Sequence, residues 1–95
     1  MSRDFLNIAH RGFSGRYPEN TIRAFKEAIA MGCRWLECDV RLTADGVPVV
    51  IHDSTLDRTT DGSGAVSSMT SDDIRALDAG SWMNPAFSGE RVPTL

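Results

Sequence analysis

The first third of the sequence combines a short apolar run with a helical stripe. Residues 5–10 are mostly apolar and lead into a glycine-containing loop, which predicts a buried strand followed by a loop. A helix is expected next, with Asn20 as its N-cap and Gly32 as a left-handed cap at its end. Apolar residues recur at helical spacing along this segment: Ile22, Phe25 and Ile29, with Ala24 and Ala28 beside them.

Residues 35–42 have the alternating pattern of a second strand. One face carries Leu36, Cys38, Val40 and Leu42, and the other carries Trp35, Glu37, Asp39 and Arg41. Asp45-Gly46 is a strong turn signal, and the β-rich segment 47–52 follows too closely for a crossover helix. The pattern therefore predicts an antiparallel hairpin. Pro48 lacks a backbone N–H, so it is expected to place the returning strand at a sheet edge.

The remaining sequence has few regular elements. Residues 53–70 are rich in Ser, Thr, Asp and Gly and predict an irregular excursion, followed by a short helix with Ser71 as its N-cap. Trp82 and Phe87 are expected to give this excursion a small core of its own. Thr94 is typical of the N-cap of a further helix, so the 95 residues are expected to be an N-terminal piece of a longer protein.

Composition is that of a soluble globular protein and disfavours several classes of partner. The 95 residues are 41% hydrophobic and 24% charged, with a net charge of −3. A nucleic-acid or anionic-membrane binder would instead show basic clusters, so no nucleic-acid partner is expected. No apolar run approaches the roughly 18–20 residues of a membrane span. The N-terminus also lacks the pattern of a signal peptide.

Cys33 and Cys38 are too few for a disulfide scaffold and lack zinc-site spacing. They are expected to be free, buried thiols of a reducing compartment, with a disulfide as the less favoured alternative. A cytoplasmic location is expected on this basis.

Glu37 and Asp39 lie two positions apart in the second predicted strand. Their carboxylates should project from the same face, about 6–7 Å apart along the chain. Such close negative charges repel each other unless a cation or proton lies between them, and Mg²⁺ or Ca²⁺ accepts carboxylate oxygens. The spacing of Glu37 and Asp39 is equally compatible with the polar face of an amphipathic strand, in which Arg41 would be the partner of the two acids.

Both histidines lie at the ends of predicted strands. His10 precedes Arg11 and a glycine-containing loop, which is a catalytic position in many α/β proteins, and His52 ends the returning strand. Taken singly, each is more typical of a structural histidine. If Asp45-Gly46 form a two-residue turn, His52 lies opposite Asp39 on a shared face. A three-residue loop with a glycine bulge would turn His52 to the other face, unless the ladder has already ended there.

A shared site would combine acids, imidazoles and a guanidinium. Arg11 supplies a planar cation suited to phosphate, and two imidazoles can divide the roles of base and acid near neutral pH. Together with a metal, these groups suit phosphodiester cleavage. Acyl transfer and nucleoside triphosphate binding are disfavoured, because neither a serine-elbow motif nor a P-loop motif is present.

Five ordered segments resemble the glycerophosphodiester phosphodiesterase family. They are His10-Arg11-Gly12, Pro18-Glu19-Asn20-Thr21, Glu37-Cys38-Asp39-Val40, residues 45–53, and Leu56-Asp57-Arg58-Thr59-Thr60. Residues 92–95 are also similar to the family's lead into its next helix. Each segment alone is weak evidence, but their order from Ile8 to Leu95 is specific.

The resemblance implies an α/β fold, namely the N-terminal part of a TIM (β/α)₈ barrel with a β-hairpin and a small inserted subdomain. Residues 1–52 would hold the first two barrel strands, the first helix and the hairpin. Residues 53–91 would be the insertion, and residues 92–95 the start of the next barrel helix. A whole barrel needs about 250 residues, so the barrel is incomplete here. Its uncovered apolar faces and edges are expected to favour self-association of the segment.

The resemblance also implies an activity, a cofactor and a residue set. The family hydrolyses small-molecule glycerophosphodiesters to glycerol 3-phosphate and an alcohol, using a divalent metal ion, Ca²⁺ or Mg²⁺. His10 and His52 would be the general acid–base pair, and Arg11 would bind phosphate. Glu37 and Asp39 would be metal ligands, with a third acidic ligand from a later strand.

Glu19 and Asn20 match the family's segment beside the site. Asn20 is expected chiefly as a helix cap, and Glu19 either supports the site or has no role in it. The isolated segment is expected to be inactive, or to be a non-catalytic phosphate- and metal-binding module. A related phosphodiesterase acting on phosphoinositide or sphingolipid-type diesters is the other alternative, which residues on later strands would decide.

Overall fold

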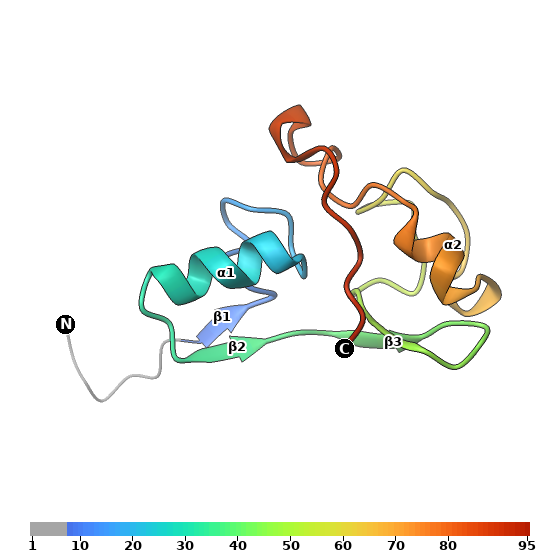
Figure 1. The fold of residues 1–95 in the computed structure, drawn as a ribbon, viewed down its shortest axis with the longest axis horizontal. Coiled ribbons are helices and arrows are strands. Elements are labelled where there is room, and N and C mark those ends of the chain that lie inside the picture. Colours follow the sequence, from blue (N-terminus) through green and yellow to red (C-terminus); the bar gives the residue numbers. More distant parts are fainter. Residues whose placement is uncertain (1–7) are drawn as a thin grey trace.

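The first half of the molecule is a strand–helix–strand unit. A computed structural model of the protein describes residues 8–95, so residues 5–7 of the expected first strand lie outside the described residues. The unit consists of β1 (Ile8–His10), α1 (Ile22–Ala30) and β2 (Trp35–Glu37). The two strands are parallel neighbours, and α1 lies along one side of them (Figure 1). His10 pairs with Glu37, so both residues lie at the carboxyl edge of the unit.

The second half begins with an antiparallel hairpin, as the Asp45-Gly46 signal predicts. Its strands are β3 (Val40–Leu42) and β4 (Pro48–Val50), with Val40 opposite Val50 and Leu42 opposite Pro48. The prediction of one continuous strand over residues 35–42 is wrong, because Cys38 and Asp39 separate β2 from β3. The chain changes partner at this break, since β2 pairs with β1 and β3 pairs with β4.

Residues 44–46 form a three-residue loop at the tip of the hairpin, between Thr43 and Val47. The Thr43 N–H donates to the Val47 carbonyl oxygen at 3.1 Å. Gly46 has a φ of 76°, the left-handed conformation that a glycine bulge requires. The two-residue turn that would place His52 opposite Asp39 is therefore wrong, and the pairing follows the three-residue alternative.

β4 is covered on its second side, so it is not the open edge that Pro48 predicts. The Pro48 carbonyl oxygen accepts a hydrogen bond from the Leu95 N–H at 3.1 Å, and Val49 lies antiparallel to Thr94. Pro48 takes the first position of the strand, where a missing N–H is tolerated. Residues 92–95 contain no helical turn, and the further helix expected to begin there stays a prediction.

The excursion after β4 is built from short elements. They are a 3-10 turn at Val66–Ser68, α2 (Ser71–Arg75) and a second 3-10 turn at Pro85–Phe87. Thr70, not Ser71, is the N-cap of α2, because its side chain accepts a first-turn N–H. The core shared with the hairpin is aliphatic: Val49, Ile51, Leu56, Val66, Ile74, Ala79 and Val92. The expected Trp82–Phe87 core is wrong, since Trp82 is exposed and Phe87 packs against Tyr17, with ring centroids 5.6 Å apart.

α1 begins and ends at defined caps. Its N-cap is Thr21 and not Asn20, because Oγ1 of Thr21 accepts a hydrogen bond from the Ala24 N–H at 3.2 Å. At the other end Gly32 is left-handed, with a φ of 91°, and its N–H donates to the Ile29 carbonyl oxygen at 2.9 Å. The expected glycine cap is thus confirmed. In the described part of the chain, no helix has the length and apolar character needed to cross a bilayer.

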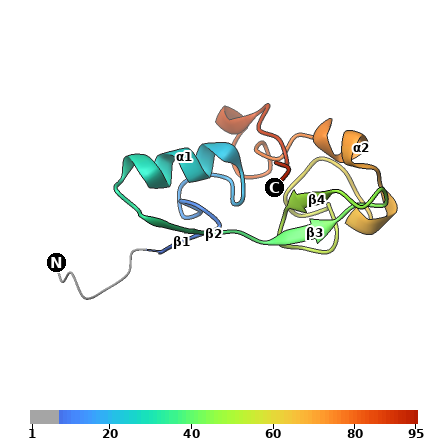
Figure 2. The same ribbon diagram turned by 60° about the horizontal axis from the view of Figure 1, so that its bottom comes forward.

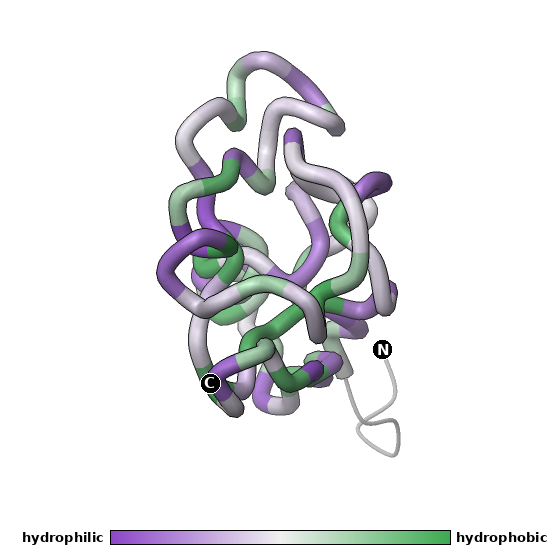
Figure 3. Tube along the Cα trace, turned by 90° about the vertical axis from the view of Figure 1, so that its right-hand side faces the viewer, coloured by the Kyte–Doolittle hydropathy of each residue, from purple (hydrophilic) through white to green (hydrophobic). Residues whose placement is uncertain are grey.

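Several large apolar residues of α1, β2 and β3 are exposed. Six of them are 42% to 61% exposed: Ile22, Ile29, Trp35, Leu36, Val40 and Leu42. α1 lies on one side of β1 and β2, and no helix among residues 8–95 covers the other side of these two strands (Figures 1 and 2). Hydrophobic and hydrophilic stretches alternate over short distances along the trace (Figure 3). Exposed apolar residues of this kind agree with the incomplete barrel expected from the sequence.

The two cysteines are free, as expected, but they are not buried. Cys33 is partly exposed and Cys38 is exposed. The break between β2 and β3 explains the position of Cys38, because a residue between two short strands need not follow the alternation of either. The cytoplasmic location stays a prediction.

Gly12 allows the loop after β1 to approach α1 closely. Its φ is 76°, and a Cβ there would lie 2.8 Å from the carbonyl carbon of Ala24. Gly12→Ala is therefore expected to lower the free energy of unfolding by about 2 kcal/mol or more, through backbone strain and overlap. Gly15→Ala is the control, because a Cβ at that position meets nothing within 4 Å. Urea unfolding compares the two variants, and equal effects would contradict this role of Gly12.

Candidate active site

His10 and Glu37 meet at the carboxyl ends of β1 and β2. Nε2 of His10 lies 3.6 Å from Oε1 of Glu37, and the His10 side chain is 64% exposed. The backbone N–H of Arg11 donates to the Glu37 carbonyl oxygen at 2.8 Å and contacts Oε1 at 3.2 Å. One imidazole and one carboxylate of the predicted set therefore share an edge that is open to a small molecule.

The Arg11 guanidinium lies between two acids. Nη1 is 3.4 Å from Oε2 of Glu19, and Nε is 3.1 Å from Oδ2 of Asp39. The second contact is an ion pair without the alignment of a hydrogen bond, since the buried Nε has no hydrogen-bond partner among the described residues. The Arg11 side chain is only 21% exposed, so these charges are less screened than a surface pair.

Arg41 is not the partner of the two strand acids. Its guanidinium donates twice to the His52 carbonyl oxygen, at 2.8 and 3.0 Å, and so fixes the backbone that follows β4. The repulsion expected between Glu37 and Asp39 is reduced by a different arginine. Asp39 pairs with the Arg11 guanidinium, and Glu37 accepts the Arg11 N–H.

Asn20 lies behind these charged groups rather than at the end of α1. It is 3% exposed, its Nδ2 donates to Oδ2 of Asp39 at 3.1 Å, and its N–H donates to the Arg11 carbonyl oxygen at 2.9 Å. Asn20 and Arg11 both have left-handed φ values, 60° and 58°. Such strain in residues other than glycine is concentrated at functional sites. The expected helix cap is thus corrected to a support for the Arg11–Asp39 pair.

His52 belongs to a second charged group. Nδ1 of His52 lies 2.8 Å from Oδ1 of Asp53, and the Asp53 carboxylate also accepts from Nε and Nη2 of Arg58, at 2.9 and 3.0 Å. The hydrogen bonds from Arg58, followed by the contact with His52, hold the pKa of the Asp53 carboxyl well below its usual value. Asp53 and then Glu19 raise the pKa of the Arg58 guanidinium above its usual value.

Glu19 connects the two groups. It accepts from Nη1 and Nη2 of Arg58 at 3.0 and 2.9 Å, on the same carboxylate that contacts Arg11. Its side chain is 10% exposed. The contacts form one continuous series: His10, Glu37, Arg11, Glu19, Arg58, Asp53 and His52. Glu19 thus contacts both arginines of the series, and its role in the site stays a prediction.

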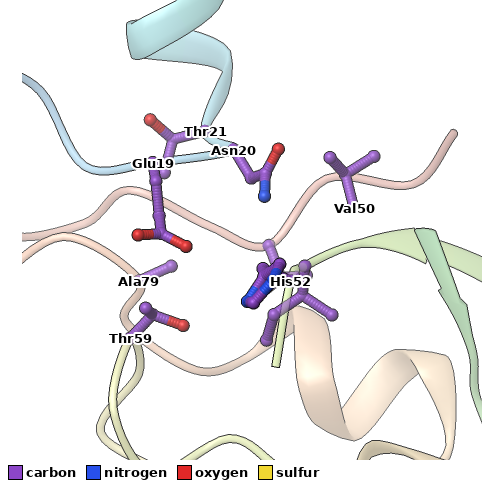
Figure 4. Close-up of a pocket in the computed structure, with 9 residues that line it drawn as sticks. Glu19, Asn20, Thr21, Val50, His52, Thr59 and Ala79 are labelled. Atoms are coloured by element: carbon purple, nitrogen blue, oxygen red, sulfur yellow. The ribbon is translucent and has the colours of Figure 1, made fainter. Parts of the chain in front are cut away.

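The two imidazoles line different cavities. Glu19, Asn20, His52 and Thr59 line a small cavity of about 10 Å³, room for no more than about one water molecule. Figure 4 shows Glu19 and His52 pointing toward a common space. His10 lines a wider hollow of about 420 Å³ beside the loop after β1. The structure therefore joins the predicted residues through contacts, with one imidazole at each end of the series.

The register explains the position of His52. The ladder ends at the Val40–Val50 pair, and the next backbone bond runs from the Ile51 N–H to the Asp39 carbonyl oxygen at 2.9 Å. Ile51 is buried in the aliphatic core, whereas His52 follows it beyond the ladder. The contact with Asp53 therefore orients the His52 ring, where the two-residue turn predicted a pair with Asp39.

Asp53 and Arg58 belong to this series of contacts, although the sequence pattern did not single them out. Both fall in the family-like segments, which was the available signal. Asp53 directly follows a histidine, but sequence adjacency does not show that the two side chains meet. Arg58 contacts Glu19 across 39 positions, a separation that no local pattern reveals.

Glu37 and Asp39 fit part of a site for a hard divalent cation. Mg²⁺ and Ca²⁺ prefer oxygen ligands, and the two side chains are 38% and 23% exposed. The contacts of Arg11 and Asn20 fall on Oδ2 of Asp39, so Oδ1 is the oxygen left for a cation. Within residues 8–95, no three His, Cys, Asp or Glu side chains are grouped to hold a metal ion. The pair therefore suits a shell that other ligands complete.

Known proteins similar to this chain are glycerophosphodiester phosphodiesterases. A glycerophosphodiester phosphodiesterase of Caldanaerobacter subterraneus is 56% identical over 90 residues, covering 95% of this chain and 37% of the relative. The crystal structure of a glycerophosphodiester phosphodiesterase from Agrobacterium tumefaciens superposes with a TM-score of 0.92 at 49% identity, over 96% of this chain and 40% of that one. The chain thus spans well under half of these relatives.

A third similar protein was solved with a bound molecule. It is a phosphodiesterase of Oleispira antarctica in complex with the product sn-glycerol-3-phosphate, with a TM-score of 0.93 at 45% identity over 96% of this chain and 37% of that one. The solved relatives are TIM-barrel enzymes, so the expected fold class, a partial barrel, is confirmed. The model of the glycerophosphoryl diester phosphodiesterase family matches residues 10–95, and the chain belongs to that family.

Proposed function

We propose that this chain supplies half of the active site of a metal-dependent phosphodiesterase that hydrolyses glycerophosphodiesters to glycerol 3-phosphate and an alcohol. The observation that carries the proposal is the grouping of His10, Glu37 and Asp39 around Arg11 at the edge where β1 and β2 end. Active sites of this barrel class lie at the carboxyl ends of the strands. Family membership and the sn-glycerol-3-phosphate bound to the Oleispira enzyme support a glycerol phosphate ligand.

Arg11 is suited to bind the phosphoryl group. Its contacts with Glu19 and Asp39 are made by Nη1 and Nε, and a guanidinium has five N–H donors, so donors remain for phosphoryl oxygens. Glu19 and Asp39 hold the guanidinium in place before the substrate arrives. Preorganised positive charge of this kind stabilises the negative charge that develops in the transition state.

His10 and His52 are proposed as the acid–base pair. One imidazole removes a proton from the attacking water, and the other protonates the departing alcohol oxygen. Phosphorus gains a bond to the water oxygen and loses its bond to the alcohol oxygen. Each imidazole has a carboxylate neighbour, Glu37 for His10 and Asp53 for His52, and such a neighbour orients the ring.

Glu37 and Asp39 are proposed to hold a divalent cation, Ca²⁺ or Mg²⁺, with a further ligand from outside this chain. When bound, such an ion stabilises negative charge on phosphoryl oxygens. Asp39 would then be paired both with the ion and with the Arg11 guanidinium, and both positive charges would attract a phosphate.

The proposed reaction is tested by identifying its products. A complete barrel carrying these residues is incubated with glycerophosphocholine and a divalent ion, and the phosphorus products are followed by ³¹P NMR. Glycerol 3-phosphate and free choline are the expected products. Phosphocholine, or no hydrolysis of any glycerophosphodiester, would contradict the proposed function.

The 95-residue segment alone is proposed to self-associate and to lack turnover. Exposed apolar strand residues such as Leu42, at 61% exposed, are a surface that a second copy can bury. Sedimentation velocity should show mass rising with concentration, and Leu42→Gln should shift the distribution toward the monomer. A concentration-independent monomer would contradict this proposal.

A further inference from the structure

Arg58 links the irregular excursion to the site through four hydrogen bonds. Two of these bonds reach Asp53, at 2.9 and 3.0 Å, and two reach Glu19, at 3.0 and 2.9 Å. Asp53 directly follows His52, whereas Glu19 lies in the loop between β1 and α1, so a single side chain joins two separate segments. The Arg58 side chain is 45% exposed, so water alone could satisfy its N–H groups. Its four hydrogen bonds to two acids therefore indicate a specific role.

Each acid that Arg58 holds is itself in contact with a proposed functional group. Oδ1 of Asp53 lies 2.8 Å from Nδ1 of His52, and Oε2 of Glu19 lies 3.4 Å from Nη1 of Arg11. One guanidinium therefore restrains both the acid–base imidazole and the phosphate-binding guanidinium. The planar fork of arginine makes this arrangement feasible, because it presents donors to two carboxylates in fixed directions.

We propose that Arg58 is a positioning residue of the phosphodiesterase site, an inference that rests on the proposed function. It holds Asp53 against His52 and Glu19 against Arg11, and through these acids the excursion sets the orientation of both functional groups. Arg58 itself stays outside the reacting atoms.

The contact of Arg58 with Asp53 fixes the tautomer of His52. Because Arg58 lowers the pKa of Asp53, this carboxyl is ionised at neutral pH and can only accept hydrogen bonds. At 2.8 Å, Nδ1 of His52 must then carry the proton, which leaves Nε2 as the nitrogen that exchanges a proton with the substrate. Without Arg58 the carboxylate loses its second anchor, and the ring loses a defined orientation.

Arg58→Met tests the proposal by kinetics in the complete barrel. Turnover (kcat) is expected to fall about 10- to 100-fold, the usual cost of removing a group that orients a functional side chain. Arg58→Lys should give an intermediate kcat, because an ammonium has no planar fork. Arg75→Met is the matched control, since Arg75 is an exposed arginine in the last turn of α2. A kcat for Arg58→Met within twofold of the Arg75→Met value would overturn the proposal.

A double-mutant cycle separates positioning from general support of the fold. If Arg58 acts on His52 through Asp53, then Arg58→Met should lower kcat much less in an Asp53→Ala background than in the wild type. Equal losses of kcat in both backgrounds would contradict an action of Arg58 through Asp53.

The contact of Arg58 with Glu19 leads to a separate prediction. Glu19→Gln should raise KM more than it lowers kcat, because Glu19 holds the phosphate-binding Arg11.

The ¹⁵N chemical shifts of His52 provide a readout independent of turnover. The His52 signals are assigned with His52→Gln, and the neutral ring should be found with Nδ1 protonated in the wild type and in Arg75→Met. Arg58→Met should produce a mixture of His52 tautomers. If this variant does not fold, Arg58→Lys is measured in its place. If the wild type is inactive but Arg58→Met changes the His52 tautomer, the proposed function is rejected and the positioning role is kept. If the wild type is active but neither Arg58 variant changes the tautomer, the positioning role is rejected and the proposed function is kept.

Discussion

His52→Ala is expected to lower the turnover of a glycerophosphodiester in the complete barrel by about 10²- to 10⁴-fold, and His10→Ala by a similar factor. Each imidazole is the proposed partner for one proton transfer, and a methyl group cannot replace it. The two rings lie at opposite ends of the contact series, so neither is placed to take over the other's role. Turnover is measured at saturating substrate, and circular dichroism confirms that each variant folds.

Several outcomes distinguish a catalytic histidine from a structural one. The His10 side chain is 64% exposed, so His10→Ala should change the thermal midpoint little while turnover collapses. Arg75→Met again serves as the control variant, with expected turnover near that of the wild type. Near-normal turnover in both histidine variants would show that the acid–base assignment is wrong.

Replacing Glu37 or Asp39 is expected to have the second large effect, on the dependence of activity on the divalent ion. Glu37→Gln and Asp39→Asn keep the shape of each side chain but remove the charge that a divalent ion needs. The ion concentration for half-maximal activity is expected to rise about 10-fold or more in each variant, and a chelator should abolish wild-type activity. Calorimetric titration with Ca²⁺ and Mg²⁺ measures the same change without turnover.

Asp72→Asn is the matched control for the metal experiment. Asp72 is an exposed acid in the first turn of α2, and its replacement should leave the ion dependence unchanged. Asp39→Asn is expected to have the larger effect of the two strand variants, because Asp39 also pairs with the guanidinium of Arg11. Activity that survives the chelator, with normal ion dependence in both strand variants, would contradict the metal assignment.

Local patterns predicted the elements better than their boundaries. The strand–loop–helix order, the glycine cap at Gly32 and the hairpin follow from periodicity and turn residues, and the structure has them. The break at Cys38 and Asp39 could not be predicted in this way. Asp39 contacts Arg11 and Asn20, which lie in the loop between β1 and α1, and such long-range contacts do not follow from the alternation of the strand.

The register illustrates a second limit. Asp45-Gly46 is compatible with both a two-residue and a three-residue loop, and the difference is one residue in every pair of the hairpin. The backbone bond from Thr43 to Val47 closes the longer loop. His52 and Asp39 are therefore not cross-strand partners, as the two-residue turn would have made them. Both residues nevertheless belong to the same network of contacts around Arg11 and Glu19.

The apolar pattern of the strands also predicts more burial than this chain provides. Leu36 and Val40 have the character of core residues but are 42% and 43% exposed. The chain spans 37% of the Caldanaerobacter relative, so most of the barrel that a full-length relative contains is not among these residues. Burial depends on the whole assembly of strands and helices, whereas the pattern reports only which face would be buried.

His10, Arg11, Glu37, Asp39 and His52 are proposed above all to act as one site around a single phosphoryl group. Titration of the complete barrel with sn-glycerol 3-phosphate and a divalent ion, followed through the imidazole resonances, tests this most directly. We expect the signals of His10 and His52 to move together and saturate at one dissociation constant, with Arg11→Met weakening both responses equally. Movement of only one imidazole, or two different dissociation constants, would show that the residues belong to separate sites.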